Sequence, residues 1–271
     1  MNSLLVENYF RVDKLPHIWC PGCGHGIIMA SIGRAIENLG LDKDKVCIVS
    51  GIGCSSRAPG YMDFNTLHTT HGRALAFATG VKLANPELEV IVVAGDGDLS
   101  AIGGNHLIHA ARRNIDITTI CFNNNIYGMT GGQYSPTTPT HDKGTTAPYG
   151  NIDKPFDITK LAGGAGATYT AKSTVYHVNQ LQKYIETAIK HEGFSLVEAI
   201  SICPTYYGRK NKKGSVVDMM NFLKDSFVDH KVAEKLPPEK VEGKFLMGEF
   251  VNKVEPEYTA LYDGIIEKLK K

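Results

Sequence analysis

Short apolar runs and amphipathic stretches alternate along most of the chain. Five apolar runs have the length and composition of buried strands, at residues 46–49, 90–94, 115–122, 167–170 and 194–202. Segments with helical spacing or helix-opening turns lie between and after them, at residues 27–39, 66–84, 103–113, 156–161 and 177–191. Because strands and helices alternate, the sequence predicts an α/β fold with a doubly wound, mostly parallel sheet.

The segment after residue 211 has a different composition. Residues 216–228 and 258–269 can form helices, and Pro237 and Pro238 interrupt the chain between them. We therefore interpret residues 1–211 as one α/β domain that includes an N-terminal arm. Residues 212–271 are interpreted as a helical tail that packs on this subunit or on a partner subunit.

Two polar turns follow successive predicted strands in the centre of the chain. Gly95 and Gly97 flank Asp96, and the glycines free the backbone to turn and to approach a ligand closely. Asn124 follows the next strand, and the carboxyl ends of parallel strands meet at one edge of a sheet. Each turn alone is common in proteins, but the pair favours a magnesium site with oxygen ligands. The main-chain carbonyl of Ile126 is a candidate third ligand.

The backbone just after Asp96 suits an anion. Free N–H groups around Gly97 and Asp98 can cradle a diphosphate, and His71, at a predicted helix start, can donate to a phosphate. A plain helix-capping role for His71 is about equally compatible with its position. The long polar loop at residues 130–154 is expected to be functional or covered by a partner, as loops of this length usually are.

The six cysteines fall into two groups. Cys47 and Cys121 lie inside apolar strand runs and are interpreted as small core residues. The others stand at turns marked by glycine or proline: Cys20, Cys23, Cys54 and Cys203. Cys20 and Cys23 form a close pair at the start of a predicted helix, where the thiolate form is favoured. On its own this pair fits a redox dithiol, a zinc site or an iron–sulfur cluster.

The set consists of one close pair and two widely separated single cysteines. This spacing favours a [4Fe–4S] cluster modestly over zinc, because zinc sites usually contain two close pairs of ligands. Cys54 follows the strand at residues 46–50, so it belongs on the same sheet edge as Asp96. Zinc cannot accept an electron, so it would have no role beside that site. An iron–sulfur cluster can accept an electron there.

Composition and charge indicate which partners and which cellular compartment to expect. The chain has 271 residues and a net charge of +1, which implies no nucleic-acid partner. The N-terminal residues lack a signal-peptide pattern, and no stretch is long and apolar enough to span a membrane. We therefore expect a cytoplasmic protein, whose cysteines in a reducing compartment serve metal binding, catalysis or packing rather than disulfides.

The sequence Gly95-Asp96-Gly97, followed by Asn123-Asn124, resembles the motif of thiamine-diphosphate enzymes. In that superfamily the aspartate and an asparagine hold the magnesium ion of the cofactor. The resemblance assigns these roles to Asp96, Asn124 and the Ile126 carbonyl.

A wider resemblance is to the β subunit of 2-oxoacid:ferredoxin oxidoreductases. Its motifs are Trp19-Cys20-Pro21-Gly22-Cys23-Gly24, Gly51-Ile52-Gly53-Cys54-Ser55-Ser56, His71-Gly72-Arg73-Ala74, Gly95-Asp96-Gly97-Asp98, Asn123-Asn124, Ile126-Tyr127-Gly128-Met129-Thr130 and Cys203-Pro204-Thr205. The loop Gly131-Gly132-Gln133 with Thr137-Thr138-Pro139, and Tyr206-Tyr207-Gly208-Arg209, are similar to the 2-oxoglutarate-type members.

The resemblance implies the cofactors and their residues. Thiamine diphosphate would be bound by residues of the strand-end loops, namely Ile52, Gly53, Cys54, Ser55, His71, Gly95, Gly97, Asp98, Gly128 and Met129. A [4Fe–4S] cluster would be held by Cys20, Cys23, Cys54 and Cys203. Arg57 could pair with a substrate carboxylate, although a solvated arginine is about as compatible with the sequence.

The implied reaction is the coenzyme-A-dependent oxidative decarboxylation of a 2-oxoacid, with 2-oxoglutarate favoured, and its reverse. Electrons would pass through the cluster to ferredoxin. No general base for the cofactor is apparent, so the resemblance implies an α subunit that supplies it. Two alternatives stay open: a non-redox thiamine-diphosphate decarboxylase or lyase, and a zinc-stabilised subunit without catalysis.

Overall fold

The computed structural model describes residues 3–270 and contains a wide central sheet. The sheet has eight strands in the order β2-β1-β3-β4-β8-β7-β10-β9. Their bounds are β1 Val46–Ser50, β2 Asn65–His68, β3 Glu89–Gly95, β4 Thr118–Asn123, β7 Tyr169–Thr174, β8 Ser195–Ile200, β9 Phe227–Asp229 and β10 Phe245–Asn252. The first six strands in this order pair in parallel, and β10 joins β7 antiparallel. The predicted mostly parallel sheet is confirmed.

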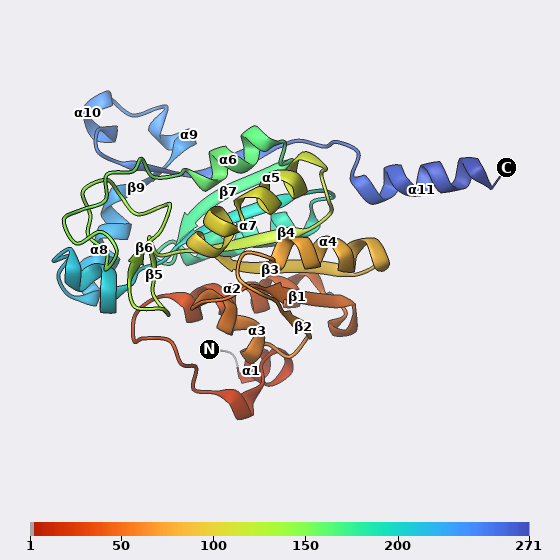
Figure 1. The fold of residues 1–271 in the computed structure, drawn as a ribbon, viewed down its shortest axis with the longest axis horizontal. Helices are drawn as coiled ribbons and strands as arrows, with labels where there is room; N and C mark the ends of the chain where they lie inside the picture. The colour runs from red at the N-terminus through yellow and green to blue at the C-terminus, as the bar shows by residue number, and fades with distance from the viewer. Residues whose placement is uncertain (1–2, 271) are drawn as a thin grey trace.

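Hydrophobic cores lie on both faces of the sheet. Alternate strand residues point to opposite faces, so Ile91 and Val93 join one core while Val90 and Val92 join the other. The longest helices that pack on the first core are α2 His25–Leu39 and α7 Val178–Lys190. Three helices cover the second, α4 Ala74–Ala84, α5 Gly104–Arg112 and α6 Ile158–Ala165. The fold is therefore doubly wound (Figure 1), and the predicted fold class is confirmed.

One predicted helix is shorter than expected. The helix predicted to open within residues 66–73 and to run to Ala84 begins only at Ala74, as α4. Residues Asn65–His68 instead form strand β2, which pairs in parallel with Cys47–Ser50 at the edge of the sheet. Pairing with β1 outweighs the local conformational preference of these residues, which is a common reason why strands are missed from the sequence alone.

The N-terminal arm and the smaller connections contain short elements of their own. The arm includes α1 Ser3–Tyr9, and Phe10 forms an isolated bridge with Met62. Other short elements are α3 Ala58–Tyr61, the hairpin β5 Ile126–Tyr127 with β6 Gln133–Tyr134, α9 His230–Ala233 and α10 Pro238–Val241.

The segment after residue 211 both joins the sheet and leaves it. Helix α8 Val216–Ser226 opens with a capping box between Ser215 and Asp218, and β10 returns to pair with β7. The chain ends in α11 Tyr258–Leu269, which extends away from the body of the molecule (Figure 1). Among residues 3–270, no helix has the length and apolar character needed to cross a membrane.

Candidate active site

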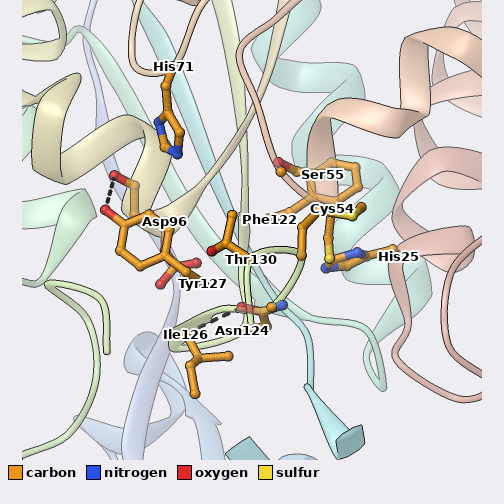
Figure 2. A pocket seen from close by; sticks show the side chains of 14 residues that line it. His25, Cys54, Ser55, His71, Asp96, Phe122, Asn124, Ile126, Tyr127 and Thr130 are labelled. Atoms are coloured by element: carbon orange, nitrogen blue, oxygen red, sulfur yellow. Dashed lines mark hydrogen bonds between the residues drawn. The ribbon is translucent and has the colours of Figure 1, made fainter. Parts of the chain in front are cut away.

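A pocket opens at the carboxyl edge of the sheet, where β1, β3 and β4 end. The residues that line it are His25, Gly53, Cys54, Ser55, His71, Asp96, Gly97, Phe122, Asn124, Ile126, Tyr127, Gly128, Met129 and Thr130. Figure 2 shows His71, Asp96 and Tyr127 toward one side of the pocket and Cys54, Ser55 and His25 toward the other. This is the edge where an open α/β sheet binds its ligands.

Asp96 is buried directly after β3, and the polar loop at residues 130–154 covers it. The hydroxyls of Ser135 and Thr137 donate to its Oδ2 atom at 2.5 Å and 2.6 Å. Burial raises the pKa of Asp96 to about 6, and these two hydroxyls oppose the rise. A buried carboxylate in this state gains from a nearby cation, because the cation favours its charged form. The donor set therefore fits a divalent metal ion.

The loop after β4 brings Asn124 and Ile126 to the same pocket as Asp96. Asn124 Oδ1 accepts from the backbone N–H of Ile126 at 3.3 Å (Figure 2), and both residues line the pocket. The hydroxyl of Tyr127 donates to the Gly97 carbonyl at 3.0 Å, which ties this loop to the turn after β3. A side chain at position 97 would collide with the Tyr127 ring, so glycine is required there.

Asp98 connects three loops beneath the pocket. Its Oδ1 atom accepts from the backbone N–H groups of Gly72 at 2.8 Å and Ile52 at 3.3 Å, and it pairs with His71 Nδ1 at 2.7 Å. Burial raises the pKa of Asp98, whereas the Gly72 N–H and then His71 lower it. Asp98 is therefore a clamp between the loops after β1 and β3 and the loop before α4.

Four of the six cysteines lie together beside the pocket. A Cβ atom at position 128 would lie 3.3 Å from Cys54 Sγ and 3.7 Å from Cys203 Sγ, so both sulfurs border Gly128. Burial first, and then the neighbouring Cys203, Cys23 and Cys20, together raise the pKa of Cys54 to about 12. These thiols are thus close enough to repel one another when ionised.

Cys20 and Cys23 reach this place through contacts with the segment after β8. The Ile202 backbone N–H donates to the Cys23 carbonyl at 3.2 Å, and Thr205 Oγ1 donates to Cys20 Sγ at 3.2 Å. Burial raises the pKa of Cys23 to about 11. Such thiols become thiolates when a metal centre binds them, so their chemistry fits the predicted cluster.

Within residues 3–270, no group of three or more histidine, cysteine, aspartate or glutamate side chains is arranged to hold a single metal ion. A cluster assigns each thiolate to a different iron, so its ligands stand farther apart than those of one ion. The other two cysteines, Cys47 and Cys121, are buried in the core that α4, α5 and α6 cover, as predicted.

The structure brings most of the predicted site residues together. Ten of them line the pocket: Gly53, Cys54, Ser55, His71, Asp96, Gly97, Asn124, Ile126, Gly128 and Met129. Gly95 and Asp98 lie just behind its wall, whereas Ile52 and Arg57 are exposed outside it. The binding roles of all these residues stay predictions.

Four pocket residues were missing from the predicted set, namely His25, Phe122, Tyr127 and Thr130. Each stands within two positions of a predicted site residue, which was the available signal. His25 is fully buried between the rings of Trp19 and Phe122, and neither ring nitrogen has a hydrogen-bond partner among the described residues. Burial lowers the pKa of His25 to about 4, so the imidazole is neutral.

Comparison with protein families identifies the class that this fold and pocket define. Residues 51–199 match the family described as thiamine pyrophosphate enzyme, C-terminal TPP binding domain. The matched region begins directly after β1 and contains β2, β3, β4, β7 and most of β8, together with the loops that form most of the pocket. The resemblance to thiamine-diphosphate enzymes is confirmed.

Individual relatives narrow this class. The 2-oxoglutarate synthase subunit KorB of Methanothermobacter marburgensis is 55% identical over 260 residues, covering 96% of this chain and 91% of the relative. The subunit of the same name from Methanocaldococcus jannaschii is 53% identical and covers 97% of each chain. The chain belongs to the family of 2-oxoacid:ferredoxin oxidoreductase β subunits that includes these 2-oxoglutarate synthase subunits. It is therefore a subunit of an oxidoreductase, as expected.

A solved structure supports the same assignment. The 2-oxoglutarate:ferredoxin oxidoreductase from Magnetococcus marinus, with 2-oxoglutarate, coenzyme A and succinyl-CoA bound, superposes with a TM-score of 0.86. It is 36% identical in sequence, and the match covers 100% of this chain and 92% of that one. The similarity therefore includes the segment after residue 211.

Proposed function

We propose that this chain is the β subunit of a 2-oxoglutarate:ferredoxin oxidoreductase. In the proposed reaction a 2-oxoacid, here 2-oxoglutarate, and coenzyme A give the acyl-CoA, carbon dioxide, a proton and two electrons, and ferredoxin takes the electrons. The reverse reaction, a reductive carboxylation, uses the same groups. The observation that carries the proposal is that Cys54 and Asp96 line one pocket, beside which Cys203 borders Gly128.

Asp96, Asn124 and the carbonyl of Ile126 would hold Mg²⁺ with the diphosphate of thiamine diphosphate. The cofactor supplies an electron sink for the decarboxylation of the 2-oxoacid. The chain's own part is to bind and orient it. Backbone groups at Gly53 and Gly97 leave room for the diphosphate, and the Asp98 clamp keeps His71 at the pocket wall.

Cys20, Cys23, Cys54 and Cys203 would hold a [4Fe–4S] cluster, which supplies one-electron transfer. Cys54 is the link between the two sites, because its side chain belongs both to the pocket and to the group of thiols. Cys20 is the exposed member of the group, while Cys23 and Cys203 are buried. Ferredoxin would receive electrons at the exposed side.

A partner α subunit is required to complete the site. Asp96 is the single carboxylate among the described pocket-lining residues, and it is committed to the metal ion in this proposal. The α subunit would supply the general base for the cofactor. The loop at residues 130–154 is the proposed contact, since Tyr149 and Ile152 are 98% and 89% exposed. Arg57, also exposed, stays the candidate for the substrate carboxylate at that boundary.

The test is anaerobic co-purification with the neighbouring subunit, followed by analysis for iron, acid-labile sulfide and magnesium-dependent thiamine diphosphate. A panel of 2-oxoacids is then assayed with coenzyme A and a low-potential dye. We expect iron and sulfide in equal amounts and dye reduction that is fastest with 2-oxoglutarate. Zinc without sulfide would eliminate the redox function, and decarboxylation without dye reduction would indicate a lyase.

A further inference from the structure

A buried ion pair lies under the sheet edge that carries the pocket. Lys172 on β7 and Glu198 on β8 are register partners, and Lys172 Nζ lies 3.0 Å from Glu198 Oε2. Glu198 is 2% exposed, and Lys172 also pairs with Asp157 at 3.1 Å. Burial by itself would lower the pKa of Lys172, but the two carboxylates raise it above its ordinary value. The ammonium group therefore stays charged.

The second oxygen of Glu198 connects this pair to the pocket. Asn123, at the end of β4, donates from Nδ2 to Glu198 Oε1 at 2.7 Å. On its other side, Asn123 Oδ1 lies 3.1 Å from Thr137 Oγ1, whose single hydroxyl hydrogen it shares with the nearer Asp96 Oδ2 at 2.6 Å. A continuous line of buried polar contacts thus runs from Lys172 to Asp96.

The donors and acceptors in this line leave one orientation for the Asn123 amide. Its oxygen accepts the backbone N–H of Asn125 at 3.0 Å, so its nitrogen must face Glu198. Glu198 Oε1 then accepts from Asn123, while Oε2 lies in ion-pair contact with Lys172 Nζ. A glutamine at this position would offer one acceptor and one donor group, so its amide nitrogen would have to face either the Asn123 amide nitrogen or the Lys172 ammonium group.

We propose that Lys172 and Glu198 are positioning residues, which fix the Asn123 amide and, through Thr137, the carboxylate of Asp96 for the metal ion. This inference rests on the proposed function, because it assumes that Asp96 holds Mg²⁺ with a diphosphate. Neither residue lines the pocket, so their influence passes through Asn123 and Thr137.

Strand β10 completes the burial of the pair. Gly248 of β10 is the register partner of Lys172, and the Phe250 ring centroid lies 6.0 Å from Lys172 Nζ. The segment after residue 211 therefore supports the metal site from a distance, by keeping water away from the ion pair.

The test is Glu198→Gln in the complex with its partner subunit, with thiamine diphosphate titrated at several Mg²⁺ concentrations by calorimetry. Mutation of a residue that hydrogen-bonds to a metal ligand typically lowers metal affinity by about 10–100-fold. We expect magnesium-dependent binding to weaken by about tenfold. Adding Lys172→Met should bring the cofactor affinity back to within about threefold of wild type. The carbonyl of the introduced glutamine side chain is then free to face Asn123. A purely structural ion pair predicts the opposite, a double variant weaker than either single one.

Asp157→Asn is the matched control. It removes the other carboxylate beside Lys172 but can still cap α6, and it has no contact with Asn123. Its affinity should stay within about twofold of wild type. The inference is wrong if Glu198→Gln binds the cofactor like wild type, or if Asp157→Asn weakens binding equally. It is also wrong if the double variant shows no recovery of affinity, and this last criterion applies even where Glu198→Gln alone does not fold. If wild-type complex itself binds no magnesium and cofactor, the proposed function fails, and this inference with it.

Discussion

The two halves of the site are held in different ways. On the oxygen side, defined by Asp96, Asp98, His71 and Asn124, side chains hold other side chains and loops through hydrogen bonds and an ion pair. On the sulfur side, defined by Cys20, Cys23, Cys54 and Cys203, many of the contacts involve the main chain. The Trp19 indole donates to the Cys54 carbonyl at 2.7 Å, for example, and backbone N–H groups lower the pKa of Cys23 and Cys54.

This difference has a physical reason. Carboxylates and amides form strong directional hydrogen bonds, so neighbouring residues can fix them before any ligand binds. Thiols are weak donors and acceptors, and here burial, followed by the neighbouring thiols, raises the pKa of Cys23 and Cys54. The oxygen side is therefore prepared by the fold, whereas the sulfur side gains its charged form only with a bound metal centre.

The largest expected effect comes from Asp96→Asn, which removes the charge at the centre of the oxygen side. We expect magnesium-dependent thiamine-diphosphate binding to fall by more than about 100-fold, beyond the usual effect of an outer-shell partner. Calorimetry measures this loss, and the iron content and visible spectrum should be unchanged. Loss of iron with retained cofactor binding would show that the two sites have been assigned the wrong way round.

Cys54→Ser should produce the reverse pattern, because it removes one ligand on the sulfur side. We expect iron and sulfide to fall to less than about half of wild type, since all four cysteines would hold the proposed cluster. Cys121→Ser is the control, as that thiol is buried in the core on the other face of the sheet from Cys23 and Cys203. An equal loss of iron in both variants would mean that the cysteines have been sorted incorrectly.

A smaller effect is expected for Asp98→Asn, which weakens the clamp without touching the metal ligands. Loss of the charge beside His71 should loosen three loops and weaken cofactor binding by about tenfold. Asp116→Asn is the matched control, since Asp116 pairs with Lys82 at 2.6 Å before β4, at the opposite edge of the sheet. It should lower the melting temperature while leaving cofactor affinity unchanged. If both variants change affinity equally, Asp98 has no specific role in the site.

Much of this arrangement follows from local sequence patterns. Asp96 and Asn124 could be placed on one edge because their strands are apolar, short and joined by a helix, which makes them parallel. Cys54 could be placed there for the same reason. These are cases in which position along a strand determines position in space.

Contacts made by loops and by distant segments were not predictable in this way. Ser135 and Thr137 reach Asp96 only because a long loop folds back over the sheet edge, and no periodic pattern describes that path. Strand β2 was missed because its pairing with β1 depends on tertiary contact, and β10 was missed because it lies beyond two prolines. The Lys172–Glu198 pair is visible only once β7 and β8 are in register.

The order of the strands has a consequence for cofactor maturation. Cys20 and Cys203 stand near opposite ends of the domain sequence, and they meet only after β1, β3, β4 and β8 have assembled side by side. A zinc finger can use its metal to drive folding, because its ligands are near one another along the chain. Here the four cysteines meet only in the assembled sheet, so delivery of iron to the proposed cluster would be a late event in biogenesis, and an iron-starved cell would accumulate a folded apoprotein.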